Sequence, residues 1–269
     1  MTDLAARLAR ARAELGARFG FPDFRAGQRR AVRAALAGRS ALVVLPTGGG
    51  KSLCYQVPAL VLDKLTVVVS PLISLMQDQV GAARARGIAA EAMTSHQSPA
   101  ERARVLEDVA GGRLRLLYVA PERLASGHLL GVLRRTGVAL LAVDEAHCVA
   151  EWGHDFRPAY RQLGPVRRAL GMPPTLALTA TATPAVRAEI VASLRLGAAE
   201  RIIGSFDRPN LRLAASRISD DDERRHRLLD PPLPERRHHP FQLRRLPLAR
   251  GERRQQRLAR RPLPAVDLQ

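Results

Sequence analysis

Short apolar segments recur along the first 216 residues, and most of them precede a stretch with helical character. They are rich in Val and Leu, they end next to Pro, Ser, Thr or Asp, and they comprise residues 41–45, 65–69, 114–119, 138–143 and 176–179. None shows a regular alternation of polar and apolar residues, so each is predicted to be buried on both faces. Buried strands that alternate with helices are typical of an α/β fold, in which helices cover both faces of a mostly parallel sheet.

This pattern stops at about residue 217. Residues 217–269 contain one Val, one Ile and one Phe and are rich in Arg and Pro. We therefore predict one domain over residues 1–216 and a disordered or weakly helical tail over residues 217–269. Two interpretations of the tail are open: a GC-rich gene read out of frame, or a basic arm that binds phosphate backbones.

Composition narrows the class of protein. Hydrophobic residues make up 46% of the 269 residues, which is enough for a sizeable core. The sequence has no apolar run of the ~18 residues that suggest a membrane span and no export signal, so we expect a cytoplasmic protein without a membrane partner. The two cysteines, Cys54 and Cys148, exclude a disulfide scaffold and a four-cysteine zinc site.

The net charge of +18 is unusually high. Nearly all of the cations are arginines, and a GC-rich genome explains part of that bias. A balance this basic still favours a polyanionic partner, most often nucleic acid.

A glycine-rich turn follows the first predicted strand. It consists of Thr47, Gly48, Gly49, Gly50, Lys51 and Ser52. A strand, a glycine turn and a helix N-terminus form a cradle for phosphates, in which Lys51 would contact the β- and γ-phosphates and Ser52 would hold Mg²⁺. The strict phosphate-loop pattern is not met, because Leu45 stands at its first glycine position. The alternative is a structural turn before a helix.

Two carboxylates follow the predicted strand at 138–143. In the resulting sequence Asp-Glu-Ala-His, Asp144 would bind Mg²⁺ and Glu145 would polarise the attacking water. The alternative is an acidic first turn of a helix. Because the carboxyl ends of parallel strands meet at one edge of a sheet, we expect Asp144, Glu145 and Lys51 to lie close together as a catalytic group.

These two motifs resemble motifs I and II of superfamily 2 helicases, and further segments narrow the resemblance to the RecQ family of ATP-dependent DNA helicases. The segments resemble motifs 0, Ia and Ib, the aromatic-rich loop, motif III and the segment closing the first motor domain, and they occupy residues 19–28, 70–79, 118–124, 152–160, 178–182 and 206–210. The match covers about residues 15–212 in the family's order. It implies a RecA-like P-loop domain, the first motor domain of a helicase.

The segment at 19–28 is identified with adenine recognition. The amide of Gln28 offers a donor and an acceptor and can pair with both the exocyclic amine and N7 of adenine. Arg25 and Phe21 would flank the base. The alternatives are core packing for Phe21, and more so for Phe24, and a solvated helix position for Gln28.

The aromatic-rich segment is a candidate surface for single-stranded DNA. Trp152 and Phe156 would stack on bases, and Arg157 would contact phosphate. The alternative for the aromatic residues is an apolar cover of the sheet edge. His154 is assigned to the same surface, since a zinc site with His147 lacks a recognised ligand spacing.

Four more residues are assigned to DNA or to its coupling with ATP. Ser70 either contacts a DNA phosphate or caps a helix. The resemblance implies that His147 relays between nucleotide and DNA. Thr179 and Thr181 either take part in this link or satisfy turn backbone.

The resemblance implies ATP hydrolysis coupled to 3′–5′ translocation and to duplex unwinding in recombination and repair, with ATP and Mg²⁺ as cofactors and single-stranded DNA and duplex junctions as partners. No part of 217–269 resembles the family's second motor domain, so we expect a chain limited to the first. The alternative function is a fragment that binds ATP and single-stranded DNA with little turnover. A P-loop kinase or GTPase is disfavoured, because Asp-Glu-Ala-His and the aromatic loop have no place there.

Overall fold

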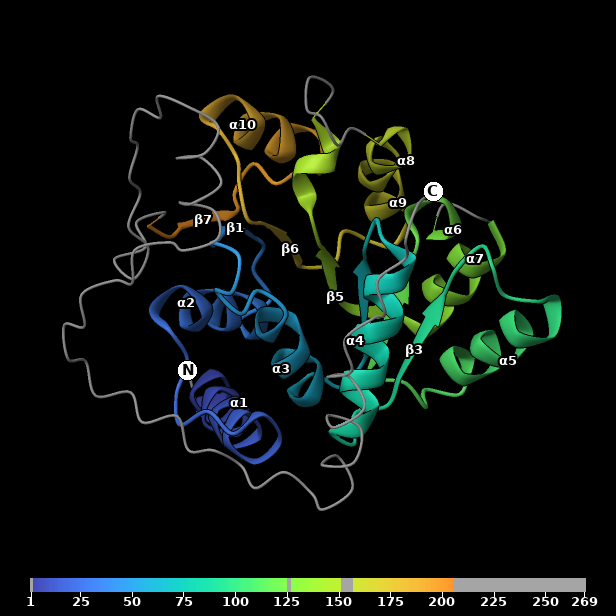
Figure 1. Ribbon diagram of the computed structural model, residues 1–269, viewed down its shortest axis with the longest axis horizontal. Coiled ribbons are helices and arrows are strands. Elements are labelled where there is room, and N and C mark those ends of the chain that lie inside the picture. The colour runs from blue at the N-terminus through green and yellow to red at the C-terminus, as the bar shows by residue number, and fades with distance from the viewer. Residues whose placement is uncertain (1, 125–126, 151–156, 206–269) are drawn as a thin grey trace, which may run out of the picture. The chain divides into compact units, whose positions relative to one another are not determined.

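The computed structural model describes residues 2–124, 127–150 and 157–205, and one sheet organises them (Figure 1). Its seven strands follow the order β3-β4-β2-β5-β6-β1-β7, and every neighbouring pair is parallel. The strands are β1 Ala41–Val44, β2 Leu65–Val69, β3 Ala90–Met93, β4 Leu116–Val119, β5 Val138–Val143, β6 Thr175–Thr179 and β7 Glu200–Ile203. The predicted parallel α/β fold is confirmed.

The five strands predicted from sequence are all present, and the sequence analysis missed two. The missed strands, β3 and β7, are the two edges of the sheet. β3 carries one charged residue and β7 carries two, and both strands are only partly buried, because an edge strand has a neighbour on one side alone. Their short, mixed sequences lack the continuous apolar run that marked the central strands.

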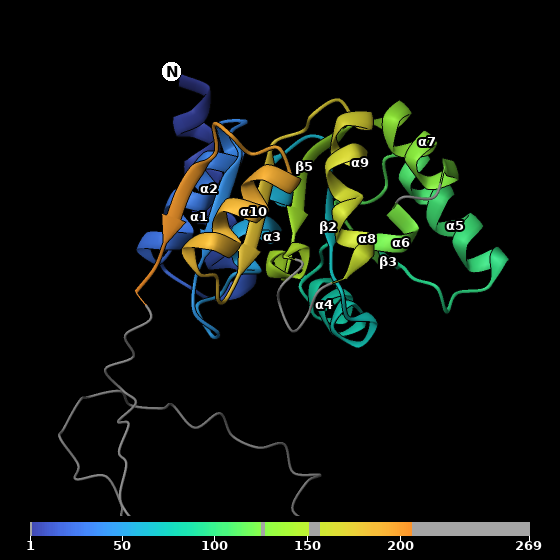
Figure 2. The ribbon, with the colours of Figure 1, turned by 90° about the horizontal axis from the view of Figure 1, so that it is seen from above.

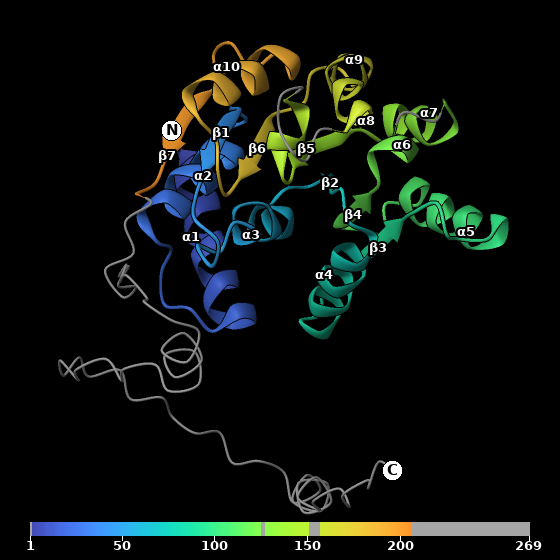
Figure 3. The same ribbon diagram turned by 45° about the horizontal axis from the view of Figure 1, so that its top comes forward.

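Helices cover both faces of the sheet, as predicted, and Figure 3 shows α9 and α10 on one side of the row of strands and α3 and α4 on the other. The helices are α1 Thr2–Phe19, α2 Ala26–Leu36, α3 Leu53–Val61, α4 Ile73–Ala85, α5 Pro99–Ala110, α6 Pro121–Leu124, α7 Gly127–Thr136, α8 Pro158–Arg161, α9 Leu163–Ala169 and α10 Pro184–Ser193. A short 3₁₀ helix, η1, spans Ala146–Val149.

Successive residues of a strand enter different cores, which explains the continuous apolar runs. Val67 and Val69 pack into the core that contains residues of α5, α7, α9 and α10, whereas Val68 packs into the core with residues of α2, α3 and α4. A third cluster joins α1 to α2 and α3, and Phe24 is part of it. The core position considered for Phe24 is therefore confirmed.

A buried arginine ties the amino ends of two strands to α10. Arg167 is 5% exposed, and its guanidinium donates to the carbonyls of Pro173, Leu194 and Arg195 and to Ser40 Oγ, over 2.8 to 3.2 Å. Ser40 and Pro173 stand just before β1 and β6. This network fixes two strands that carry parts of the site described below.

Among the described helices, none is long and apolar enough to cross a membrane. The tail predicted for residues 217–269 lies outside the described residues, as does the segment at 206–210.

Candidate functional site

The glycine-rich turn connects the carboxyl end of β1 to α3. Gly48 and Gly50 have φ of +76° and +71°, a region that side chains with a Cβ rarely adopt. A Cβ on Gly49 would lie 2.7 Å from the carbonyl oxygen of Pro46. All three glycines are therefore required by the backbone of a turn that leads directly into α3, and the Gly49 N–H closes it by donating to the Pro46 carbonyl at 2.8 Å.

Gln28 holds this turn through its amide. Gln28 lies in the first turn of α2 and is 4% exposed. Its Oε1 accepts a hydrogen bond from the Arg25 N–H at 2.9 Å. Its Nε2 donates to the carbonyls of Gly49 and Gly50 at 2.9 and 3.2 Å. A Cβ at Gly50 would collide with that Nε2. Gln28 is thus a buried side chain with three hydrogen bonds, and the alternative of a solvated helix position is wrong.

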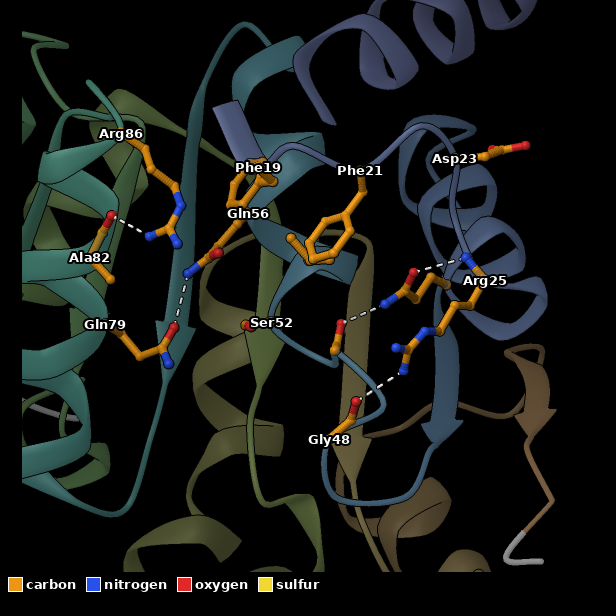
Figure 4. Close-up of a pocket in the computed structure, with 13 residues that line it drawn as sticks. Phe19, Phe21, Asp23, Arg25, Gly48, Ser52, Gln56, Gln79, Ala82 and Arg86 are labelled. Carbon is orange, nitrogen blue, oxygen red and sulfur yellow. Dashed lines mark hydrogen bonds between the residues drawn. The ribbon is translucent and has the colours of Figure 1, made fainter. Parts of the chain in front are cut away.

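A pocket of about 310 Å³ opens beside Gln28 (Figure 4). Phe21 lines it with 49% of its surface exposed, and Arg25 lines it while donating to the Gly48 carbonyl at 3.0 Å. Gly48, Gly50 and Ser52 also contribute to its wall. Phe21 is therefore not a core residue, and an aromatic ring and a guanidinium border the same pocket. Thr47 is exposed and Lys51 half-buried in the same turn.

Asp144 and Glu145 stand where β5 ends, two strands away from the glycine turn. The Asp144 N–H donates to the Val69 carbonyl at 2.9 Å, and Asp144 Oδ1 accepts from the Glu145 N–H at 3.0 Å. Glu145 has φ of +46°, a left-handed conformation that a non-glycine residue adopts at a cost of order 1–3 kcal/mol. A four-residue 3₁₀ helix follows, instead of the α-helix of the structural alternative.

Electrostatics connect Asp144 with the glycine turn. Burial, and then the neighbouring Glu145 carboxylate, raise the pKa of Asp144 from 3.8 to about 6, while the Lys51 ammonium opposes this rise. Lys51, Asp144 and Glu145 therefore form one electrostatic group, as the sequence predicted from the parallel strands. A half-buried carboxylate with a raised pKa lacks sufficient positive charge nearby.

A magnesium ion fits this requirement. The hydroxyl of Ser52 and the carboxylate of Asp144 are hard oxygen donors of the kind that Mg²⁺ prefers. Within the described part of the chain, no group of three or more His, Cys, Asp or Glu residues is arranged to hold a metal ion by itself. Mg²⁺ is usually bound by one or two protein carboxylates together with substrate phosphates.

His147 and Thr179 connect β5 to β6. Thr179 Oγ1 donates to the Thr181 carbonyl at 3.0 Å, so it accepts the contact of 2.9 Å from His147 Nδ1–H. Hydrogen bonds with Cys148 and with Glu145 raise the pKa of His147 to about 10. His147 Nδ1 also lies 3.3 Å from Glu145 Oε2. Thr179 Oγ1 also accepts from the Thr181 N–H at 3.3 Å, so Thr179 satisfies the backbone of its turn, as the alternative held. The same hydroxyl contacts His147, whose Nδ1 lies beside the Glu145 carboxylate.

Two contacts that sequence reasoning missed hold the end of the aromatic-rich segment to the site. The hydroxyl of Tyr160, a fully buried residue, donates to the Asp144 carbonyl at 3.0 Å. Arg157 donates to the Pro71 carbonyl at 2.8 Å. The aromatic pattern of the sequence indicated a functional role for this segment. It could not predict these two bonds, because every residue type has a backbone carbonyl that can accept them.

Ser70 lies at the end of β2 with 2% of its surface exposed. The residue capping α4 is Leu72, so the helix-cap interpretation of Ser70 is wrong. Its Oγ has no hydrogen-bond partner within the portion of the chain that the structure describes. Trp152, His154 and Phe156 lie outside the described residues.

Comparison with known proteins gives a consistent result. Residues 25–190 match the DEAD/DEAH box helicase family. Over 194 residues the chain is 48% identical to the ATP-dependent DNA helicase RecQ of Haemophilus influenzae, which covers 72% of this chain and 31% of that protein. It is 45% identical over 212 residues to the probable ATP-dependent DNA helicase RecS of Bacillus subtilis, covering 78% of this chain and 42% of that protein. The chain thus spans less than half the length of these curated relatives.

Solved structures show the same fold. The helicase MrfA bound to DNA superposes with a TM-score of 0.59 at 19% identity, covering 72% of this chain and 29% of MrfA. The Mycobacterium smegmatis helicase Lhr, bound to single-stranded DNA and AMP-PNP, superposes with a TM-score of 0.54 at 23% identity, over 72% of this chain and 27% of Lhr. At these identities the likeness concerns the fold alone.

Proposed function

Because this chain belongs to the DEAD/DEAH box helicase family, we propose that it is the first motor domain of a RecQ-type DNA helicase, which binds ATP at the carboxyl edge of its sheet and couples hydrolysis to movement along DNA. The observation that carries this proposal is the meeting of the glycine turn, Lys51, Asp144 and Glu145 at one edge of the sheet. We extend the proposal to 3′–5′ translocation, to unwinding at duplex junctions in repair and recombination, and to action in the cytoplasm.

The phosphates of ATP fit the glycine turn. The backbone N–H groups of this turn bind the phosphate oxygens, and Lys51 supplies the positive charge that the β- and γ-phosphates require. Ser52 and Asp144 would hold Mg²⁺, which would neutralise charge on the phosphates. Glu145, held in its left-handed conformation, accepts a proton from the attacking water.

The adenine base fits the pocket next to the turn. Phe21 and Arg25 border it and stack on the two faces of the base. Gln28 lines the same pocket and recognises the base edge through its amide. One nucleotide can therefore place its base between Phe21 and Arg25 and its phosphates on the glycine turn, because the pocket and the turn are adjacent.

DNA is assigned to the same edge of the sheet, beyond β5. Ser70 ends β2 there, with its hydroxyl buried and without a hydrogen-bond partner among the described residues, and Arg157 adds a cation next to Pro71. Trp152, His154 and Phe156 belong to the same proposed surface. The chain from Glu145 through His147 and Thr179 to Thr181 transmits the state of the nucleotide to this surface.

Titration calorimetry with ATP and Mg²⁺ on the purified chain tests this assignment. The Lys51→Ala variant should lose most of its ATP affinity, since a bound phosphate loses its charged partner. Lys64→Ala is the matched control. Lys64 is the other lysine of the chain, and it precedes the amino end of β2, whereas the glycine turn follows the carboxyl end of β1. Equal binding by the Lys51 and Lys64 variants contradicts the proposed nucleotide site.

The second candidate function is a domain that binds ATP and single-stranded DNA with little turnover. It requires only the groups at the carboxyl ends of the described strands, and the match to the RecQ relative spans 31% of that protein. Phosphate release stimulated by single-stranded DNA, and abolished by Glu145→Gln, identifies the motor. Nucleotide binding without such release identifies the second candidate.

A further inference from the structure

Helix α1 lies next to the pocket proposed for the adenine base, although it precedes the region that matches the helicase family. It spans Thr2–Phe19, whereas the family match begins at residue 25. It packs against α2 and α3 at one end of the sheet, opposite α5 and α7 (Figure 2). None of the residues assigned to ATP, Mg²⁺ or DNA above belongs to α1. Its side chains nevertheless contact the two segments that flank the pocket.

On one side, Arg12 of α1 contacts the adenine loop, residues 20–25, which connects α1 to α2. Arg12 Nε donates to the Pro22 carbonyl at 3.3 Å, and its guanidinium lies 3.9 Å from Asp23 Oδ2. Arg29 of α2 pairs with the same carboxylate oxygen at 2.8 Å. Figure 4 shows the Asp23 side chain pointing away from Phe21. The carboxylate of Asp23 therefore joins the loop to two helices.

These contacts matter because core packing does not hold Phe21 in place. Phe21 is 49% exposed, and Gly20 before it has φ of +72°, so the chain leaves α1 through a left-handed turn. Phe21 and Arg25 stand two residues before and two residues after Asp23. The bonds to Pro22 and Asp23 therefore hold the backbone between the two residues that border the proposed base site.

On the other side, α1 holds the end of α4. Arg18 Nη1 donates to the carbonyls of Arg86 and Gly87 at 2.8 and 3.1 Å, and Arg18 Nε donates to Glu14 Oε2 at 2.6 Å. The Arg86 guanidinium lies over the ring of Phe19, 5.4 Å from its centroid. Arg86 lines the pocket on its α4 side, and Phe19 lines it as well (Figure 4). One helix thus contacts both flanks of the same pocket.

We propose that α1 keeps the base pocket in its binding shape, with Arg12, Asp23 and Arg18 as positioning residues for the adenine base. This inference rests on the proposed function and extends its nucleotide site to a helix that precedes the matched region. A loop without these contacts populates conformations in which Phe21 and Arg25 do not face each other. The apparent affinity for a base-containing ligand then falls in proportion to the binding-competent fraction.

The phosphates should not depend on α1. The glycine turn that receives them is held by Gln28 of α2, through its bonds to the carbonyls of Gly49 and Gly50. Inorganic tripolyphosphate carries the phosphates of ATP but no base. Loss of the α1 contacts should therefore weaken ATP binding and leave tripolyphosphate binding unchanged.

Titration calorimetry with ATP and with tripolyphosphate, each with Mg²⁺, tests the proposal on the full chain. Asp23→Ala and Arg18→Ala should each weaken ATP binding about three- to fivefold without weakening tripolyphosphate binding. Asp3→Ala and Arg10→Ala are the matched controls on α1. Asp3 forms an exposed ion pair with Arg7 at 2.9 Å, and Arg10 is exposed. Both controls should bind ATP like the unchanged chain.

Salt gives a second measurement, which a general loss of stability does not mimic. The Asp23 and Arg29 side chains are 38% and 60% exposed, so added salt screens their attraction. The ratio of ATP affinity to tripolyphosphate affinity should therefore fall more steeply with salt in the unchanged chain than in Asp23→Ala. Asp23→Glu keeps the charge and should restore part of this salt dependence.

The outcomes separate this inference from the proposed function. If the unchanged chain binds neither ligand, the proposed nucleotide site itself fails. If it binds both, and the Asp23 and Arg18 variants bind ATP as tightly as the controls, the proposal for α1 is overturned alone, and the buried Phe24 suffices to hold the loop. Equal losses for ATP and tripolyphosphate also overturn it, because the effect would then not concern the base.

Discussion

The ionised carboxylate of Asp144 should destabilise the folded domain in the absence of Mg²⁺ and nucleotide. Its pKa is raised from 3.8 to about 6, chiefly by burial and secondly by Glu145. Each pH unit between the unfolded and the folded pKa corresponds to about 1.4 kcal/mol, so this charge costs the folded state about 3 kcal/mol at neutral pH. Asp144→Asn removes the charge and keeps an oxygen that accepts from the Glu145 N–H.

The sign of the effect follows from proton binding. The folded state holds the proton of Asp144 more tightly, so stability falls as pH rises from about 4 to about 6 and stays lowered above that range. The advantage of Asp144→Asn is therefore close to zero below pH 4 and reaches about 3 kcal/mol above pH 6. For a domain of this size, that corresponds to a melting temperature higher by roughly 6–12 °C.

Thermal unfolding at several pH values in the presence of EDTA measures this difference. Asp78→Asn is the control, because Asp78 is an exposed carboxylate on α4, and it should leave the melting temperature nearly unchanged. A gain for Asp144→Asn that does not depend on pH, or no gain at pH 8, refutes the reasoning. Adding Mg²⁺ and ATP should narrow the gap between the unchanged chain and the variant, since the ligands offset the buried charge.

Two further predictions concern contacts that support the site. Tyr160→Phe should lower the free energy of unfolding by about 1 kcal/mol in urea titrations, because the Asp144 carbonyl loses its donor; an unchanged value contradicts a role for this bond. Arg167→Leu should lower it by about 3 kcal/mol or more, because several buried carbonyls lose their donors together. Arg168→Leu, an exposed neighbour on α9, serves as its control and should have little effect.

How much of the fold could be predicted depended on where each strand lies in the sheet. β2 and β5 lie at its centre, and their continuous apolar sequences matched the predicted bounds. β3 and β7 lie at the edges, where Glu91 and Glu200 interrupt the apolar pattern. A charge is tolerated there because one side of the strand has no neighbouring strand, and that circumstance depends on the tertiary structure.

In the candidate site, too, some contacts could be predicted from the sequence and others depend on the tertiary structure. The approach of Lys51 to Asp144 was predictable, because parallel strands bring their carboxyl ends together. The bond from Tyr160 to the Asp144 carbonyl was not, since any residue type supplies the same acceptor.

The hydrogen bonds of Gln28 have a consequence for nucleotide exchange. Its Nε2 is already engaged by the carbonyls of Gly49 and Gly50, so these two carbonyls act as an internal competitor of any base that enters the pocket. A base must replace bonds that the chain makes with itself, and at about 1 kcal/mol for each bond the competition lowers affinity several-fold to tenfold or more. The same competition speeds the departure of a spent nucleotide, because the leaving base is replaced at once by partners less than 3.5 Å away.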